Sequence, residues 1–301
     1  MKCYICGNKD RKLFRESFLP RNLECLVCGV HFIDSKRIYE YKENYFLDKN
    51  SDSFISQFTQ PLLNKLFELK EKRVEAILGG DRNAKILDYG CGSGMLVQKL
   101  NRLGFNAIGF EPSYGARKVA KMENLPVYRR LESINRKFDL IMFWHSLEHI
   151  KDPSSVIKGI KKILSSKGKL LIAVPNSESW EAKIAKGKWF HFTYPIHRFY
   201  FSPRSLSFLL KRYSFEIDKI DFINFEYTSS SLAQTFLNLF FPKDVLYSIV
   251  SRRRRSLNKS KAILISIVSL ILTVVISPIL IAFYILQLFF KKSGAIVVLT
   301  K

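Results

Sequence analysis

Residues 85–94 read Lys-Ile-Leu-Asp-Tyr-Gly-Cys-Gly-Ser-Gly, and this stretch decides the fold. The apolar pair Ile86 and Leu87 predicts a buried parallel strand, and the three glycines predict a tight turn after it. Apolar residues at helical spacing follow the turn from Met95 onward. Glycine lets the backbone approach a ligand closely, and a helix N-terminus offers unpaired N–H groups. The stretch therefore predicts a strand, a glycine loop and a helix that bind a nucleotide-like ligand.

A second apolar strand, Ala107 to Phe110, leads to Glu111, which stands 23 positions after Asp88. In doubly wound α/β folds an acidic residue at this place holds a ribose. We expect the Glu111 carboxylate to accept hydrogen bonds from both ribose hydroxyls. The alternative is a glycine turn that has only a structural role in an α/β domain.

The spacing Asp-x-Gly-x-Gly-x-Gly differs from the Gly-x-Gly-x-x-Gly of dinucleotide binders. It resembles the first motif of the class I S-adenosylmethionine-dependent methyltransferases, and the resemblance extends over residues 85–215 and returns at the C-terminus. It implies that the glycine loop cradles the methionine part of S-adenosylmethionine and that Glu111 binds its ribose.

The adenine contact departs from the family pattern. Arg129 and Arg130 stand where an acidic residue is common, so we expect backbone groups and Leu131 to meet the adenine instead. The full set of cofactor-binding residues that the resemblance implies is Asp88, Gly90, Cys91, Gly92, Gly94, Glu111, Leu131 and His145.

The near-continuous apolar run Phe138 to Trp144 predicts a fourth strand that is buried on both faces. His145, Glu148 and His149 follow it, at the carboxyl end of a strand, where open α/β sheets bind ligands. This segment resembles the motif after strand four in methyltransferases like those of ubiquinone biosynthesis. In some of those relatives a Glu-x-x-Glu-His set holds a divalent metal, but His145 occupies the first position here.

Imidazole titrates near neutral pH, so His149 is our first candidate for a general base that removes a proton from a substrate hydroxyl. His145 is the second candidate, and Glu148 belongs to the same catalytic set. The alternative is that His149 only orients the loop by hydrogen bonding.

The segment from Trp189 to Pro203 is dense in aromatic residues and histidine. It resembles the substrate loop of the same methyltransferases, in which a Pro-x-His pair precedes a helix that starts at Ser-Pro. The resemblance makes His191 and His197 candidates for substrate contact and catalysis. Aromatic core packing is the alternative.

Four cysteines form two Cys-x-x-Cys-Gly knuckles: Cys3, Cys6, Cys25 and Cys28. Four thiolates complete the closed tetrahedral shell of a structural zinc site, and the spacer between the knuckles suits a zinc ribbon. A redox pair and a site without metal remain as alternatives, and His31 is expected to be a strand residue. The short N-terminus leaves no room for a secretory signal, so we expect a reducing cytoplasm.

Composition suggests one catalytic domain that carries appendages. The chain has 301 residues and a formal net charge of +23. Such an excess of positive charge predicts an anionic partner: membrane lipid, nucleic acid or a phosphorylated substrate.

Ala262 to Phe290 is a run of 29 residues without a charge, and it contains Pro278. About 20 apolar residues suffice to cross a bilayer. Positive charge flanks both ends, with Arg252 to Arg255 before the run, so both ends are expected on the cytoplasmic side. The family resemblance implies that Ala295 to Thr300 forms a seventh strand, antiparallel beside the fifth. We therefore predict a helical hairpin or a re-entrant pair that is bent near Pro278 and dips into one leaflet. A simple span and a buried core helix pair are the alternatives.

These patterns predict a doubly wound, seven-stranded Rossmann-like methyltransferase sheet with appendages. The expected parts are a zinc-ribbon-like module (1–35), a connector with leading helices (36–83), a methyltransferase domain (84–234 with 294–301) and a basic, hydrophobic, membrane-associating insertion (235–293).

The function implied by the resemblance is S-adenosylmethionine-dependent methyl transfer, and the uncharged run with its basic flanks places it at the cytoplasmic face of the membrane. The acceptor would be a hydroxyl or carbon of a sugar, a lipid-linked glycan or a quinone-like lipid, with an anionic membrane surface as partner. The alternatives are an RNA methyltransferase that uses the ribbon and the basic surface, and a non-catalytic membrane-bound scaffold. Nucleic acid is the less favoured partner, because no base-amino methylation motif follows strand four.

Overall fold

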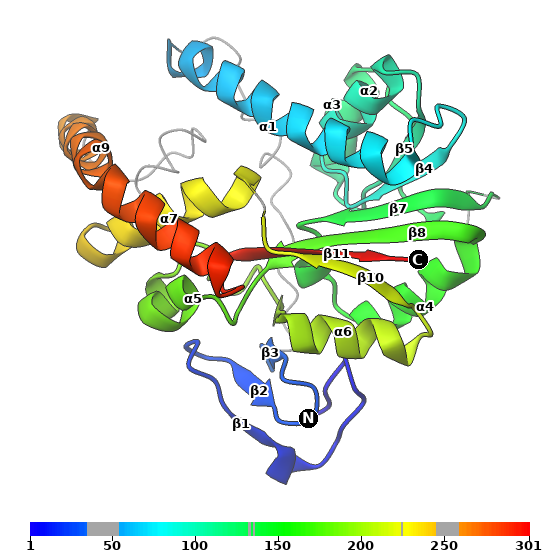
Figure 1. The fold of residues 1–301 in the computed structure, drawn as a ribbon, viewed down its shortest axis with the longest axis horizontal. Coiled ribbons are helices and arrows are strands. Elements are labelled where there is room, and N and C mark those ends of the chain that lie inside the picture. The colour runs from blue at the N-terminus through cyan, green and yellow to red at the C-terminus, as the bar shows by residue number, and fades with distance from the viewer. Residues whose placement is uncertain (35–53, 132–133, 135, 224, 245–258) are drawn as a thin grey trace.

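The computed structural model describes residues 1–34, 54–131, 134, 136–223, 225–244 and 259–301, and its centre is a seven-stranded sheet (Figure 1). The strand order is β10-β11-β8-β7-β4-β5-β6. The strands are β4 (Lys85–Tyr89), β5 (Asn106–Phe110), β6 (Val127–Tyr128), β7 (Phe138–Trp144), β8 (Leu164–Pro175), β10 (Ile217–Asp221) and β11 (Ala295–Thr300). β11 is antiparallel to both neighbours, and the other pairs are parallel. The predicted doubly wound sheet is confirmed, including its antiparallel strand beside β8.

The order of the strands reverses at β4. The chain passes from β4 to β5 on one side and later returns to β7 on the other side. Loops that leave the carboxyl ends of these strands diverge from one another, and ligands of open α/β sheets bind in the crevice between them. The topology therefore predicts a ligand site among the residues that follow β4, β5 and β7.

Helices cover both faces of the sheet. One face carries α1 (Phe54–Leu78) and α2 (Met95–Arg102), and the other carries α4 (Pro153–Ile163) and α6 (Pro203–Arg212) (Figure 1). Side chains of a strand alternate between the two faces of a sheet. Ile86 therefore packs in the core under α1 and α2, and Leu87 packs in the core under α4 and α6. Both residues are fully buried, as their apolar character predicts. α3 (Tyr114–Met122) follows β5.

A second, four-stranded sheet contains the N-terminal module. Its strands are β1 (Phe14–Glu16), β2 (Leu23–Cys25), β3 (His31–Phe32) and β9 (Phe199–Tyr200), in that order and antiparallel. β9 comes from the aromatic segment that lies between β8 and α6, so the module and that segment share one sheet. Cys3, Ile5 and Val30 also belong to the same hydrophobic core as α4 and α6.

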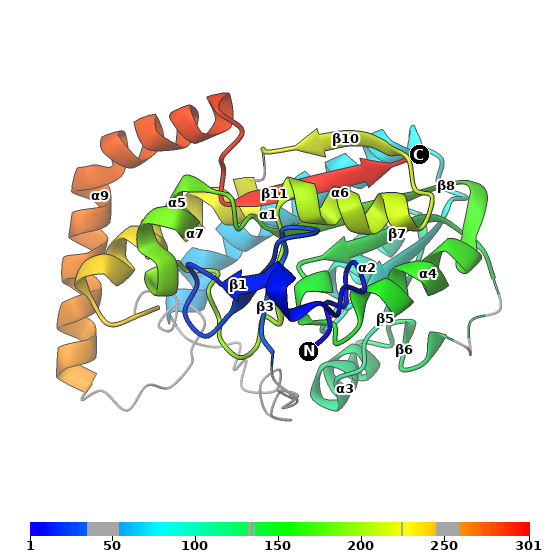
Figure 2. The ribbon, with the colours of Figure 1, turned by 90° about the horizontal axis from the view of Figure 1, so that it is seen from below.

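The uncharged run lies in α9 (Lys259–Phe289), which packs beside α7 (Phe225–Phe240). Phe283 of α9 also contacts Trp180 of α5 (Trp180–Ala185). The expected hairpin of two helices is wrong, because helical hydrogen bonding continues through Pro278 in a single helix. Proline removes one helical hydrogen bond, and this commonly bends a helix without ending it. Figure 2 shows that α9 is bent along its length.

One segment among the described residues, Ile271–Phe289, is long and apolar enough to cross a membrane by length and composition. Residues of several predictions lie outside the part of the chain that the structure describes. They include the first part of the connector (36–53) and the arginine run (252–255).

Candidate active site

The glycine loop turns sharply at the end of β4. Gly90, Gly92 and Gly94 have φ values of +79°, +57° and +80°, a region that favours glycine. A Cβ on Gly90 would lie 2.5 Å from the Cβ of Ser146, and one on Gly94 would lie 2.9 Å from a methyl carbon of Leu125. Both space and backbone conformation therefore require glycine at positions 90 and 94. The cap of α2 is Gly94, which supplies no side-chain hydrogen bond to the helix.

Glu111 is in direct contact with this loop. Its carboxylate accepts hydrogen bonds from the N–H of Gly92 (2.9 Å) and the N–H of Ser113 (2.8 Å), and the Arg117 guanidinium donates to its backbone oxygen (2.8 Å). Burial raises the pKa of Glu111, while the two amide hydrogen bonds oppose that rise. Each carboxylate oxygen has a second lone pair, so a diol could still be bound.

Asp88 is buried at the end of β4, and its burial raises its pKa to about 7, against the opposing charge of Lys70. Lys70 comes from α1, and its Nζ lies 4.9 Å from the ring centre of Trp144. The sequence analysis missed Lys70. Lys70 stands four residues before the buried Val74, and residues four apart lie on the same face of a helix. This spacing could have predicted that Lys70 faces the protein interior.

Cys91 and Leu131 take packing positions next to the cofactor loop. The Cys91 sulfur occupies the space that a side chain at Gly109 would fill, and burial raises the pKa of this thiol well above its usual value. Leu131 is half-buried against the main core after β6. Cys91 is therefore a packed thiol rather than a reactive thiolate.

The loop after β7 is held against the glycine loop. The Ser146 hydroxyl donates to the carbonyl oxygen of Tyr89 (2.6 Å), and the N–H of His145 donates to Ala173 (2.9 Å). His145 has a φ of +52°, which is uncommon for a residue with a side chain. The short helix η4 (Leu147–His149) follows, and Asp152 caps α4.

Four of the five histidines of the chain meet around Glu148. His145 Nδ1 lies 3.5 Å from a carboxylate oxygen of Glu148, and the rings of His145 and His191 stack with centroids 6.2 Å apart. The rings of His149 and His197 lie 4.6 Å apart, edge to face. The fold thus brings the histidines of the post-β7 loop together with those of the aromatic segment.

Aromatic packing also occurs in this segment. Trp189, Phe192 and Tyr200 are buried in a small core with Leu19 of the N-terminal module. His191 lies edge to face with Trp189 at 5.4 Å. The segment therefore combines both features: its aromatic residues form a core, and its histidines face the post-β7 loop.

Burial sets the charge of this cluster. It lowers the pKa of His191 and of His197 well below the usual value, so both rings are neutral at neutral pH. Burial also raises the pKa of Glu148 to about 7, with His149 acting in the opposite direction. Both carboxylate oxygens of Glu148 and the Nδ1 of His197 are buried without a hydrogen bond in the described residues.

His149 has a defined tautomer. Its Nδ1 lies 3.3 Å from the carbonyl oxygen of Ile196, and a carbonyl only accepts, so Nδ1 carries the proton. The lone pair of the neutral ring is therefore on Nε2. This half-buried histidine is the member of the cluster with the geometry of a proton acceptor.

Among the residues that the structure describes, two groups could hold a metal ion. One ligand atom from each of Glu148, His149 and His197 lies within 4.8 Å of the others. The four knuckle cysteines form the second group, with Sγ to Sγ distances of 3.6 Å (Cys3 to Cys28) and 3.5 Å (Cys6 to Cys25). Tetrahedral zinc with Zn–S bonds of about 2.3 Å separates its sulfurs by about 3.8 Å, so the cysteine group fits zinc.

A family profile described as "Methyltransferase domain" matches residues 58–220, which is more than half of the chain. The ubiquinone biosynthesis O-methyltransferase of Yersinia enterocolitica is 27% identical over 131 residues, covering 38% of this chain and 54% of that protein. The protein of the same name from Pelagibacter ubique is 28% identical over 165 residues, covering 50% and 69%. The chain spans about half the length of the first curated relatives that it matches.

Similar solved structures carry the same kind of description. An S-adenosylmethionine-dependent methyltransferase from Archaeoglobus fulgidus has a TM-score of 0.48 at 18% identity, covering 83% of this chain and 100% of that one. The magnesium protoporphyrin IX methyltransferase of Synechocystis PCC 6803 has a TM-score of 0.42 at 14% identity, covering 59% and 80%.

Substitutions at the glycine loop and at Glu111 test the cofactor site. Glu111→Ala removes the carboxylate, and Gly90→Ala drives a methyl group into Ser146. We expect each to weaken S-adenosylmethionine binding at least about tenfold, because a hydrogen bond to a charged group is worth about 1.5–3 kcal/mol. Calorimetry measures the affinity, and Glu123→Ala, at an exposed acid beyond α3, is the matched control. Wild-type affinity in both variants would rule out this pocket.

Proposed function

The chain belongs to the family of methyltransferase domains, and from that premise we propose that it transfers the methyl group of S-adenosylmethionine to a hydroxyl of its acceptor. The observation that carries the proposal is the contact between two loops: the glycine loop with Glu111, and the post-β7 loop with its histidines, joined through Ser146 and Tyr89. This contact supports a site in which a cofactor and an acceptor lie side by side.

The residues of the chain divide into two halves of this site. The glycine loop and Glu111 would bind the cofactor through backbone amides and the ribose, with Lys70 close to Asp88. The cofactor supplies a methyl group that is activated by a positively charged sulfur. The protein therefore needs to align the acceptor and remove its proton, and a covalent intermediate is not required.

His149 is the proposed general base. Its Nε2 lone pair can take the proton of an acceptor hydroxyl, while Nδ1–H remains bound to Ile196. The Glu148 carboxyl lies beside it, and an ionised carboxylate would stabilise the imidazolium that forms. His145, His191 and His197 line the same cluster as neutral or hydrogen-bonding groups.

Two substitutions of His149 separate catalysis from loop orientation. His149→Ala removes both nitrogens, whereas His149→Asn keeps an N–H donor in the place of Nδ1 and has no base at Nε2. Since general bases contribute typically about 10²–10⁴ in rate, we expect both variants to lose about that factor in kcat with unchanged cofactor affinity. Rates are measured with a panel of hydroxylated quinols and lipid-linked sugars. Recovery of activity in His149→Asn would instead assign an orienting role.

We propose that the acceptor is carried by a lipid, as in a quinone-like lipid or a lipid-linked glycan. The relatives named above are ubiquinone biosynthesis enzymes, and α9 supplies an apolar surface beside the catalytic domain. Many exposed residues of α9 are apolar, and they are Val268, Ile271, Val274, Val275, Ile279, Ile281, Ile285, Leu286 and Phe289.

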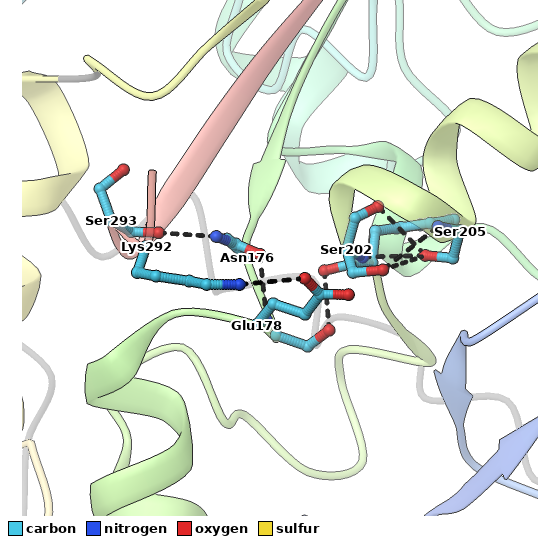
Figure 3. Close-up of polar contacts among 8 residues, drawn as sticks. Asn176, Glu178, Ser202, Ser205, Lys292 and Ser293 are labelled. Carbon is cyan, nitrogen blue, oxygen red and sulfur yellow. Dashed lines mark hydrogen bonds and ion pairs between the residues drawn. The ribbon is translucent and has the colours of Figure 1, made fainter. Parts of the chain in front are cut away.

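The chain topology supports α9 lying along one membrane face. The C-terminal end of α9 is tied to the sheet: Asn176 Nδ2 donates to Ser293 O (2.9 Å), and Lys292 pairs with Glu178 (3.5 Å), as Figure 3 shows. α7, which precedes α9, is tied to α5 through Glu181, which accepts hydrogen bonds from Ser231 and Thr235. The described elements before and after α9, which are α7 and β11, therefore belong to one body. In this proposal that body lies on the cytoplasmic side.

Sedimentation with anionic phospholipid vesicles tests the membrane proposal. We expect the wild-type protein to sediment with vesicles even at high salt, because burial of each apolar side chain gains about 1.5–3 kcal/mol. Replacing Ile271, Ile279 and Ile285 by Glu together should abolish this binding. Met122→Glu, at a 72% exposed apolar position on α3, is the matched control. A wild-type protein that stays in the supernatant would contradict the proposal.

We also propose that the four knuckle cysteines bind one structural zinc ion. Elemental analysis of untagged protein should find about one zinc per chain, since four thiolates close a tetrahedral shell. Cys28→Ser should lose most of it, while Cys91→Ser, a change at the one cysteine outside the cluster, should retain it. Absence of zinc from freshly reduced wild-type protein would contradict the assignment.

A further inference from the structure

The N-terminal module, residues 1–34 and here called the ribbon, is joined to the active site by one short strand. β3 pairs with β9, with His31 opposite Tyr200 and Phe32 opposite Phe199. The pairing continues beyond the strands, where the N–H of Ile33 donates to Arg198 O (3.0 Å). The ribbon therefore reaches the segment that carries His197.

The same segment binds the catalytic loop on its other side. The N–H of Arg198 donates to Glu148 O (2.9 Å), and His149 Nδ1 donates to Ile196 O (3.3 Å). Residues 196–198 thus lie between the ribbon and η4, with hydrogen bonds to both. Displacement of this segment would move His197 away from His149. It would also break the hydrogen bond to Ile196 O that fixes the tautomer of His149.

The ribbon is itself fastened to the outer helices. Ile5 O accepts hydrogen bonds from Ser154 of α4 (3.1 Å) and Arg212 of α6 (2.8 Å), and Val27 O accepts one from Arg204 of α6 (3.3 Å). Each knuckle is therefore anchored to α6 by an arginine. Figure 1 shows the module next to this helix. These anchors lie on the face of the sheet opposite α1 and α2, which carry the other core.

The ribbon has little structure of its own without the cysteine group. Its strands have three, three and two residues, and Cys3, Cys25 and Cys28 are fully buried. In modules of this size metal binding supplies much of the folding free energy. The position of β3, and through it that of β9, therefore depends on the cysteine group.

We propose that the ribbon is the positioning element of the acceptor half of the active site. It holds residues 196–201 so that His197 and the Ile196 carbonyl face His149, while the glycine loop and Glu111 form independently of it. The inference rests on the proposed function for the meaning of the acceptor half, but its structural content can be tested without an acceptor.

Hydrogen exchange of the full-length zinc-loaded protein, followed by mass spectrometry, tests this role. Ile33→Pro removes the N–H that binds Arg198, and Ile33→Val keeps it as the matched control. We expect exchange in residues 196–201 at least about tenfold faster in Ile33→Pro, with residues 85–94 unchanged. Affinity for S-adenosylhomocysteine should stay within about twofold of wild type, since its site is held by other elements.

A second variant covers the case in which proline disrupts the ribbon. Arg204→Ala with Arg212→Ala removes two anchors on α6 and no cysteine, and Arg11→Ala with Lys12→Ala, at exposed ribbon positions, is its control. The same faster exchange in residues 196–201 is expected. Unchanged exchange there in both test variants overturns the proposal. Faster exchange in residues 85–94 with lost affinity also overturns it, because the ribbon would then stabilise the whole domain. A wild-type protein that fails to bind S-adenosylhomocysteine contradicts the proposed function instead.

Discussion

The contact between Gly90 and Ser146 is the constraint on which the site depends. A Cβ at Gly90 would lie 2.5 Å from that of Ser146, and the Ser146 hydroxyl donates to Tyr89 O at 2.6 Å. The two loops that leave β4 and β7 are thus in direct contact at the point where the strand order reverses. This places the glycine loop against the loop that begins the histidine cluster, and the remaining elements hold one or the other of these loops in place.

Burial gives the two halves of the site a common electrostatic character. The pKa of Asp88 and that of Glu148 are both raised to about 7, because each carboxyl is removed from water. Lys70 opposes this rise at Asp88, and His149 opposes it at Glu148. A cation bound beside them would favour their ionised forms, so a positively charged ligand and the ionised site stabilise each other.

The sequence predicts most of the sheet and the geometry of the glycine loop beside Glu111, because these follow local rules. Strand, glycine loop and helix are adjacent in the chain, and Glu111 comes directly after its strand. The antiparallel β11 followed from the family resemblance, since periodicity alone does not give strand direction. Other features depend on contacts between distant residues. The β3–β9 pairing joins residues 31 and 200, and Lys70 reaches the ring of Trp144 from a helix before the first strand of the large sheet. The hairpin prediction failed because proline inside a long apolar run permits either a break or a bend.

The segment that we propose to form the acceptor half of the site is held from two sides. On one side the ribbon pairs with β9. On the other, α7 binds the segment before it, where Thr235 Oγ1 accepts from the N–H of Phe190 (3.0 Å) and Asn238 donates to Lys188 O (3.0 Å). Residues 186–200 therefore lie between the ribbon and α7, and α7 in turn packs against the apolar helix α9. The ribbon and α9 are both added to a sheet that does not need them for its own topology. Appendages that converge on one segment fit a role in acceptor recognition better than a role in cofactor binding, since the cofactor loop makes its contacts within the central sheet.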